Sequence, residues 1–455
     1  MHGLTGLAAL QDVPSAIVAR AYAALDGRLL RDDPRPVAVG VSGGGDSMAL
    51  LAIACDWGRL RGRPVLALSV DHGLQPQGRA WSEQALAQAA RMGAKTRLLT
   101  WTGDKPVHGL PAAAREARHR LLAQAAREAG ARVVLLAHTA DDVAEADWMR
   151  ARGTPLGEMA EWSPSPAWPE GRGVFLLRPL LAEGRTELRA FLRGRGIEWI
   201  EDPANDDQRF LRSQARLSLP PRRGKGGNAG ARLEAPAPPP STQTVLLPAS
   251  TPTPAPSRGR GDWFEFARAD LTDRRLVAAA LLCAAGTSRP PRSERLDALL
   301  ARLTGTAPFT TTLAGARVVA GAETVLICRE AGERARGGLP LLGLEPGSVS
   351  VWDGRWEIRV ERPGLAVGPL AGRMATLFPA DRRYVLGLPA PVRPTLPVIL
   401  DAGDDPKGRR PVLAWTVAEA SALAPARLAA ACGQIAHERA ISSHVNGAGS
   451  PARLC

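Results

Sequence analysis

The sequence predicts an α/β protein built on a doubly wound parallel sheet, followed by a C-terminal region of helices and β-strands. Three observations lead to this fold class. Short continuous apolar runs alternate with longer amphipathic segments between about residues 37 and 200, a glycine-rich turn follows the first run, and a proline-rich stretch ends the pattern. Continuous apolar strands separated by helices are typical of a parallel sheet with both faces covered.

The elements of the first third of the chain follow from their periodicity. Residues 15–30 predict a helix, because apolar side chains from Ile17 to Leu25 fall on one of its faces. Strands and helices then alternate, with strands at 37–41, 64–70, 95–101 and 132–137 and helices at 46–57, 79–92, 110–129 and 140–151. In such sheets ligands bind outside the carboxyl ends of the strands, so we expect the functional residues there.

The second half of the chain is organised differently. Residues 220–260 contain ten prolines and one acidic residue, a composition that cannot build a core and indicates a flexible linker. Residues 262–286 then predict one long helix or a helix pair, 292–303 another helix and 310–330 a β-hairpin, and a β-rich segment begins near 348.

These patterns divide the chain into five expected parts. They are a sheet domain at 1–216, a linker at 217–261, a helical and hairpin accessory domain at 262–335, a small β-rich domain at 336–440 and a disordered tail at 441–455.

Composition limits the class of protein. A net charge of +13 suits a polyanionic partner such as RNA, although only four residues are lysine, and the abundance of Arg, Ala, Gly and Pro also fits GC-biased coding. The five cysteines form no C-x-x-C and predict neither a metal cluster nor a disulfide framework. No stretch reaches the roughly 18 apolar residues of a membrane span, and the N-terminus lacks a basic leader. We therefore expect a cytoplasmic protein without a membrane partner.

The turn after the first strand reads Ser42-Gly43-Gly44-Gly45-Asp46-Ser47. Three residues without Cβ atoms let backbone N–H groups close on an anion, and the following helix adds its positive end. The two serines supply hydroxyl donors, whereas Asp46 would repel a bare phosphate and is interpreted as a ligand of Mg²⁺. An ordinary βα turn in which Asp46 begins the helix is the alternative. The sequence does not match the G-x-x-x-x-G-K-[ST] nucleotide loop.

Two further clusters carry polar residues. In AHTADDVAE, Asp141 and Glu145 are four residues apart and share a helical face, and His138 ends the preceding strand. Such acids can bind Mg²⁺ or an ammonium group, or they can simply complement the helix dipole. In AAAREARHRLL, Arg118 lies beside His119 on a helix, where a solvated face is the alternative.

Six segments in this order resemble bacterial tRNA(Ile)-lysidine synthetases: SGGGDSMALL, VDHGLQPQGRAWSEQA, AAAREARHRLL, AHTADDVAE, LLRPLL and WIEDPANDDQRFLR. The resemblance is dense over residues 37–216 and looser from 262. The glycine-rich turn is similar to the PP-loop of the N-type ATP pyrophosphatases. The resemblance therefore implies an adenine-nucleotide alpha-hydrolase-like PP-loop domain, with ATP and Mg²⁺ as cofactors. Thr139, Val143 and Ala146 depart from the pattern expected for the family.

The resemblance also implies a reaction. ATP adenylates the C2 oxygen of the wobble cytidine in a CAU-anticodon isoleucine tRNA, and free L-lysine then expels AMP. Pyrophosphate would leave into the glycine-rich turn with Mg²⁺ on Asp46, and Asp141 and Glu145 would hold the lysine ammonium. His138 would lie against the nucleotide, and Arg118 would neutralise the α-phosphate. Further residues implied for the pocket wall or the anticodon stem are Arg178, Asp202, Asn205, Arg212 and Arg216.

The accessory domain at 262–335 is implied to bind tRNA, and the oligomeric state, with a homodimer as one option, is left open.

Three other functions are considered. A cytidine 2-thiolase needs cysteines, commonly as C-x-x-C, and this sequence has no such motif. An amide synthetase would usually carry a glutaminase domain, and none is evident. A non-catalytic RNA-binding PP-loop protein is the third alternative.

Overall fold

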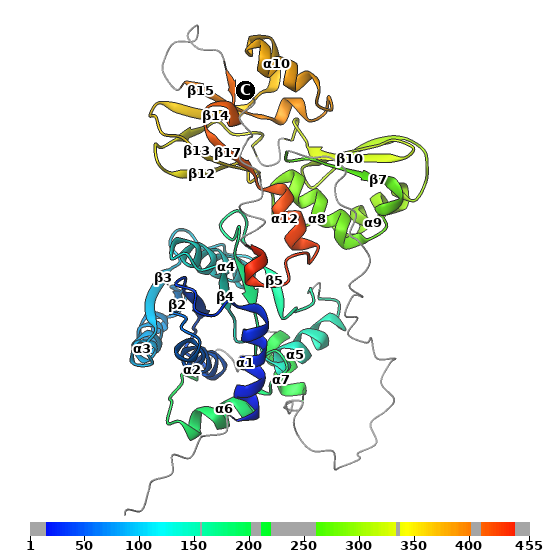
Figure 1. Ribbon diagram of the computed structural model, residues 1–455. Coiled ribbons are helices and arrows are strands. Elements are labelled where there is room, and N and C mark those ends of the chain that lie inside the picture. Colours follow the sequence, from blue (N-terminus) through cyan, green and yellow to red (C-terminus); the bar gives the residue numbers. More distant parts are fainter. Residues whose placement is uncertain are drawn as a thin grey trace, which may run out of the picture. The chain divides into compact units, whose positions relative to one another are not determined.

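The computed structural model describes residues 15–154, 157–201, 211–219, 261–333, 337–401 and 411–441 (Figure 1). These residues fall into two compact units. The first lies within Met1–Ser163, Val174–Leu233 and His437–Arg439, and the second within Pro164–Gly173, Glu234–Ala436 and Ala440–Cys455. Among the helices of the described ranges, none combines the length and the apolar character that a bilayer crossing requires.

The first unit contains a six-stranded sheet in the order β3-β2-β1-β4-β6-β5. Its strands are β1 (Val37–Gly40), β2 (Val65–Asp71), β3 (Lys95–Thr100), β4 (Val133–Leu135), β5 (Trp162–Pro164) and β6 (Phe175–Leu177). Strand β1 pairs in parallel with β2 and β4, β2 with β3, and β4 with β6. The predicted parallel sheet is therefore confirmed. Because the chain moves outward from β1 to β3 and then crosses to β4, the topological switch point lies between β1 and β4.

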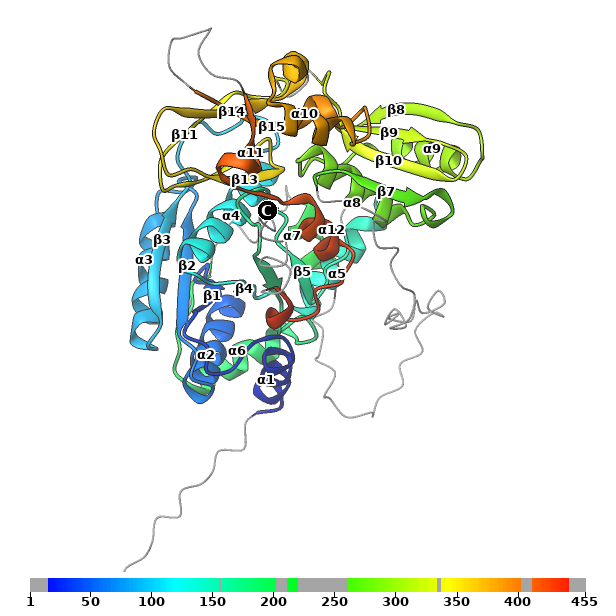
Figure 2. The same cartoon turned by 45° about the horizontal axis from the view of Figure 1, so that its top comes forward.

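The helices of the first unit are α1 (Ala16–Arg28), α2 (Gly45–Leu60), α3 (Gly78–Arg91), α4 (Leu110–Glu128), α5 (Ala140–Arg150), α6 (Arg185–Gly194) and α7 (Leu211–Ser218). Helix α2 is buried along most of its length, because it contacts α6 as well as β1 and β2. In both ribbon views α3 lies beside β2 and β3 (Figures 1 and 2). Every element predicted between residues 15 and 151 begins within one residue of its predicted start.

A short C-terminal segment, His437–Arg439, also belongs to the first unit. The Glu438 carboxylate accepts hydrogen bonds from Arg63 Nη1 and from the backbone N–H of Leu30, each at 2.9 Å. Neither the Arg63 nor the Glu438 side chain is exposed. Loss of one partner of such a buried pair costs about 3–5 kcal/mol, so this pair fixes the segment on the first unit.

The second unit contains three small sheets, in the orders β7-β10-β9-β8, β11-β14-β15-β16 and β12-β13-β17. The strands are β7 (Phe264–Ala267), β8 (Phe309–Leu313), β9 (Ala316–Ala320), β10 (Thr324–Arg329), β11 (Leu342–Leu344), β12 (Val349–Trp352), β13 (Trp356–Arg359), β14 (Leu365–Pro369), β15 (Pro397–Asp401), β16 (Val412–Leu413) and β17 (Glu419–Ala422). Its α-helices are α8 (Arg274–Ala285), α9 (Ser293–Leu303), α10 (Pro379–Leu386), α11 (Ala414–Val417) and α12 (Ala424–Ala431). One apolar core joins the sheet of β7, β8, β9 and β10 to α8, α9 and α12.

Two predictions for the second unit are wrong. The segment 262–286 begins with strand β7 and holds one α-helix, because Phe264 and Phe266 are buried on the same side of a short strand. The segment 310–330 is not a single hairpin, because it lies in a three-stranded meander of β8, β9 and β10. The linker at 220–260 and the tail beyond Ile441 lie outside the described residues, and the domain limits stay predictions.

Candidate active site

The pairing of β1 with β4 brings the two sequence motifs together. Ala38 lies opposite Val134 and Val39 opposite Leu135, so the two strands end side by side. The glycine-rich loop, residues 42–47, follows β1 and runs into α2, whereas His138 and Thr139 follow β4 and lead into α5. Both motifs therefore lie at the carboxyl edge of the sheet, next to the switch point.

The glycine-rich loop depends on Gly43 for its shape. This residue has φ +86°, a conformation that L side chains rarely adopt. A Cβ added there would lie 2.7 Å from Ile200 Cδ1, and the Ile200 N–H donates to the Gly43 carbonyl at 2.9 Å. The neighbouring Trp199 would lie 3.5 Å from a Cβ on Gly45. Residues 199 and 200 therefore support the loop, a role that the sequence did not suggest.

The two serines of the loop differ in their surroundings. The Ser47 hydroxyl is buried, donates to the Gly44 carbonyl at 2.8 Å and lies 3.2 Å from Ser42 Oγ. The backbone N–H of Ser42 also donates to Ser47 Oγ at 3.2 Å, while the Ser42 side chain is exposed. Ser47 thus holds the loop closed from within, and Ser42 remains accessible to an incoming anion.

One guanidinium joins the acids of both motifs. Arg185 Nε donates to Asp46 Oδ2 at 3.0 Å, Nη1 to Glu145 Oε1 at 3.1 Å, and Nη2 to Asp142 Oδ1 at 3.3 Å. Its backbone N–H donates to Asp141 Oδ2 at 2.7 Å. Burial disfavours the charged guanidinium, but the carboxylates around it outweigh this effect and raise the pKa of Arg185. The four acids therefore form one electrostatic cluster around a permanent cation.

Glu145 is the most enclosed acid of this cluster, with 2% of its surface exposed. Besides Arg185, it accepts a hydrogen bond from Arg212 Nε at 2.9 Å on Oε2 and one from Arg216 Nε at 2.8 Å on Oε1. Both of these arginines lie on α7. The carboxylate is thus surrounded by positively charged hydrogen-bond donors. A cationic ligand could donate to the same oxygens.

Asp142 has a structural role at the start of α5. Thr139 is the N-cap residue, its backbone N–H donates to Asp142 Oδ2 at 2.9 Å, and the two residues form a capping box. Burial raises the pKa of Asp142, but Arg212 and Arg185 outweigh burial, so the net shift is downward. Thr139, which departs from the family pattern, is explained here as the cap of α5.

His138 is held as a neutral ring. Burial lowers its pKa to about 3, although Asp142 opposes the shift. Arg178 Nε donates to His138 Nδ1 at 3.3 Å, which assigns the ring proton to Nε2. Arg178 is itself fixed by the Ala160 carbonyl, at 2.6 Å from Nη1. Arg178 thus positions His138 at the strand exit.

Arg118 lies on α4 and has no ion pair or hydrogen bond within the described part of the chain. Burial and the nearby Arg115 and Arg212 lower its pKa to about 10, so it stays charged at neutral pH. A half-buried guanidinium without a carboxylate partner suits an anionic ligand. His119, on the same helix, is neutral, because burial lowers its pKa to about 3.

Asp46 also fits a divalent cation. Its Oδ2 is occupied by Arg185, but its Oδ1 is buried and has no hydrogen-bond partner. Burial raises the pKa of Asp46, and Arg185 offsets part of that shift. The described residues hold no group of three or more His, Cys, Asp or Glu that could bind a metal. A Mg²⁺ ion here would take Oδ1 together with phosphate oxygens and water.

Burial raises the pKa of all four described cysteine thiols, Cys432 included, which disfavours a role in sulfur transfer. Burial raises the pKa of the Cys55 thiol to about 11 and that of Cys283 and of Cys328 to about 12. The thiolate is the reactive form, so these three thiols stay protonated at neutral pH.

Arg185 is the residue of the cluster that sequence reasoning missed. It begins α6, where a cation opposes the positive end of the helix dipole. The carboxylates of the cluster offset this unfavourable interaction of the guanidinium with the helix dipole. Of the residues implied for the pocket wall, Asp202 and Asn205 lie outside the described residues.

Comparison with known proteins gives a consistent family. A model described as the PP-loop domain matches residues 15–223. The chain is similar to a tRNA(Ile)-lysidine synthase of Caulobacter vibrioides, with 49% identity over 393 residues that cover 85% of this chain and 89% of that protein. It is also similar to a tRNA(Ile)-lysidine synthase of Rhizobium meliloti, with 33% identity over 78% of this chain and 80% of that protein.

Among solved structures, the chain is similar to the U34-tRNA thiolase of Methanococcus maripaludis. The TM-score is 0.37 at 18% identity, over 44% of this chain and 72% of that one.

Proposed function

The chain belongs to the tRNA(Ile)-lysidine synthase family, and from this premise we propose how its own residues carry the reaction. It is an ATP-dependent ligase that acts on tRNA(Ile). In the proposed reaction the C2 oxygen of the wobble cytidine of a CAU anticodon attacks the α-phosphorus of ATP and pyrophosphate leaves. The ε-amine of free L-lysine then attacks C2, the C2–O bond breaks, and AMP departs with the oxygen.

The glycine-rich loop and Arg118 serve the first half of this reaction. The loop N–H groups and the Ser42 hydroxyl bind the leaving pyrophosphate, and the start of α2 adds a favourable dipole. Asp46 is the residue that would hold Mg²⁺, since its Oδ1 has no hydrogen-bond partner among the described residues, and such an ion would neutralise charge on the phosphates. The guanidinium of Arg118, which has no carboxylate partner among the described residues, stabilises the α-phosphate, and the neutral, fixed ring of His138 lies against the nucleotide.

Asp141 and Glu145 serve the second half. An ε-ammonium donates to carboxylate oxygens as a guanidinium does, so we propose that lysine takes the place of Arg212 or Arg216 at Glu145. One of the two acids then accepts the ammonium proton, because only the neutral amine is a nucleophile. Arg185 keeps the remaining negative charge balanced while this proton moves.

The single observation that carries the proposal is the convergence of both motifs on Arg185. Asp46, which would hold Mg²⁺, and Glu145, which would hold lysine, contact the same guanidinium at 3.0 and 3.1 Å. Asp141, the other acid proposed for lysine, accepts a hydrogen bond from the backbone N–H of Arg185 at 2.7 Å. An adenylated base between them would meet both the leaving-group site and the nucleophile site. Proximity of this kind removes much of the entropic barrier of a reaction between separate molecules.

The test is ATP-dependent incorporation of labelled L-lysine into a CAU-anticodon isoleucine tRNA. Initiator methionine tRNA is the control, because it carries the same anticodon. Incorporation into the isoleucine tRNA alone is the expected result. AMP formation without lysine incorporation would assign a different nucleophile. If neither AMP nor lysine-labelled tRNA formed, the proposal would be overturned.

A further inference from the structure

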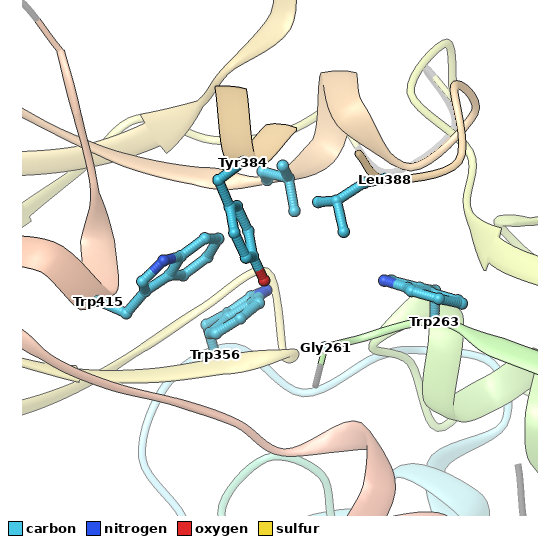
Figure 3. Close-up of a pocket in the computed structure, with 7 residues that line it drawn as sticks. Gly261, Trp263, Trp356, Tyr384, Leu388 and Trp415 are labelled. Carbon is cyan, nitrogen blue, oxygen red and sulfur yellow. The ribbon is translucent and has the colours of Figure 1, made fainter. Parts of the chain in front are cut away.

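The second unit holds an aromatic pocket, defined here by Trp263, Trp356, Tyr384, Leu388 and Trp415 (Figure 3). Its volume is about 60 Å³. A pocket of this volume holds a few water molecules. It can therefore take one planar ring, but not a ring together with its sugar and phosphate. The pocket is outside the sites already described, and nothing in the proposed reaction uses it.

The walls of the pocket are arranged before any ligand binds. Trp356 and Trp415 are stacked, with ring centroids 5.3 Å apart and an angle of 26° between the rings, and Tyr384 meets Trp415 edge-on at 5.8 Å. Trp356 is 3% exposed, and its Nε1 donates to Asp262 at 3.0 Å. Trp263 lies across the pocket from these rings (Figure 3). Rigid aromatic walls bind a planar group at low entropic cost.

Two polar groups of the pocket are free to contact a ligand. In Figure 3 the ring nitrogen of Trp263 faces the side of the pocket that holds Tyr384 and Trp356, and the Tyr384 hydroxyl lies on that side. Neither group has a hydrogen-bond partner among the described residues. One N–H donor and one hydroxyl beside flat rings match the polar edge and the two faces of a nucleobase.

The helix that carries Tyr384 holds two arginines and one acid, Asp381, whose carboxylate accepts a hydrogen bond from the Leu413 N–H. Arg382 and Arg383 precede Tyr384 on α10, and both are exposed. Neither pairs with a carboxylate in the described part of the molecule. A positive surface beside aromatic rings is the usual composition of a site for unpaired nucleic acid, in which bases stack and phosphates meet arginine.

We propose that the aromatic pocket binds one unstacked base of the tRNA substrate. The inference rests on the proposed function, because it takes tRNA as the substrate. The observations favour a base over a proline-rich peptide, since such a peptide docks along an extended groove and this pocket is the size of one ring. The base stacks on the pocket rings, and Arg382 or Arg383 meets the adjacent phosphate.

The experiment measures the Kd of the full chain for a tRNA(Ile) transcript. Tyr384→Ala removes one wall of the pocket, and we expect the Kd to rise about fivefold to a hundredfold, the usual effect of losing one base stack. Tyr384→Phe keeps the ring and should lose less affinity. Leu386→Ala is the matched control, because Leu386 is 53% exposed on the same helix and does not line the pocket.

Chemical footprinting gives a second readout. At least one tRNA base should be protected by the wild type and by Leu386→Ala, and become reactive with Tyr384→Ala. An unchanged Kd for Tyr384→Ala, or a footprint identical to that of the wild type, would overturn the proposal. A higher KM for ATP with an unchanged tRNA Kd would assign the pocket to a free nucleotide, and displacement of tRNA by a peptide of residues 236–256 would assign it to proline recognition.

The lysine incorporation assay on the wild type separates the two proposals. If the wild type forms lysidine and Tyr384→Ala binds tRNA normally, only the pocket assignment fails. If the wild type incorporates no lysine, the proposed function fails whatever the pocket binds.

Discussion

Arg185 Nε lies 3.0 Å from Asp46 Oδ2, and this contact links residues that are 139 positions apart in the chain. The same guanidinium reaches Glu145 on α5, so it connects the glycine-rich loop to the acids of the second motif. Arg185 occupies only one oxygen of Asp46, and the other oxygen is buried without a hydrogen-bond partner among the described residues. The contact therefore orients Asp46 without using up its capacity as a ligand.

Asp46→Asn is expected to lower the rate of ATP-dependent pyrophosphate release by about 100-fold or more, because it removes a charge that would hold Mg²⁺ at the leaving group. The Kd for tRNA should stay within twofold of the wild type. Pyrophosphate release and filter binding measure the two quantities. Asp56→Asn is the control, since Asp56 lies on the same helix and contacts Arg59 and Arg195 instead. A tenfold loss of tRNA affinity in Asp46→Asn would contradict the metal role.

Glu145→Gln is expected to separate the two half-reactions. The neutral amide holds an ammonium weakly, so the KM for lysine should rise about tenfold or more, the equivalent of one lost charge-assisted hydrogen bond. Pyrophosphate release should change by less than threefold. Asp147→Asn is the matched control, because Asp147 lies on the same helix and pairs only with Arg150 among described residues. If the KM for lysine were unchanged in Glu145→Gln, the lysine ammonium would be assigned to Asp141 instead.

The order of elements in the first unit could be predicted from sequence because each element shows its own local pattern. Buried strands such as β1 are short apolar runs, and α5 begins with a capping box between Thr139 and Asp142. The segment 262–286 was harder, since β7 has only four residues and the helical period of α8 dominates the window around it. The Asp273 side chain, which caps α8 through the Arg275 N–H, is the local signal of that boundary.

The composition of the site was less predictable than its position. Topology alone places the glycine-rich loop and α5 at neighbouring strand ends, so Asp46 and Glu145 could be grouped from sequence. Arg185 comes from a separate helix, and its partners lie 40 and 139 residues away along the chain. No local period encodes such a contact, because it depends on how α6 packs on α2.

Gly43→Ala is expected to impair ATP use. A side chain at φ +86° is strained, and its Cβ would lie 2.7 Å from Ile200 Cδ1, so the loop must shift at a cost of about 1–3 kcal/mol. The KM for ATP should rise and the melting temperature fall. Adding Ile200→Ala should restore part of the loss by removing the collision, but not the backbone strain. Gly27→Ala is the control, because Gly27 lies in α1 with nothing within 4 Å of an added Cβ. Equal ATP KM values for Gly43→Ala and the wild type would show that the loop tolerates a side chain.

The buried histidines predict a loss of stability in mild acid. Burial and the nearby Arg118, Arg115, Arg178 and His138 lower the pKa of His119 to about 3, whereas an unfolded histidine has a pKa near 6.5. Between pH 6.5 and 3 the unfolded chain therefore binds the proton that the folded chain excludes, so stability falls as the pH falls through this window.

For His119 alone the expected loss is about 2 kcal/mol between pH 7 and pH 5. His119→Phe removes the titrating group, so the free energy of unfolding should depend less on pH over this interval than in the wild type. Urea unfolding at the two pH values measures the difference. His108→Asn is the control, because it replaces a histidine that is exposed rather than buried. If His119→Phe and the wild type lost the same stability at pH 5, His119 would have to be protonated in the folded chain, which its buried site among arginines disfavours.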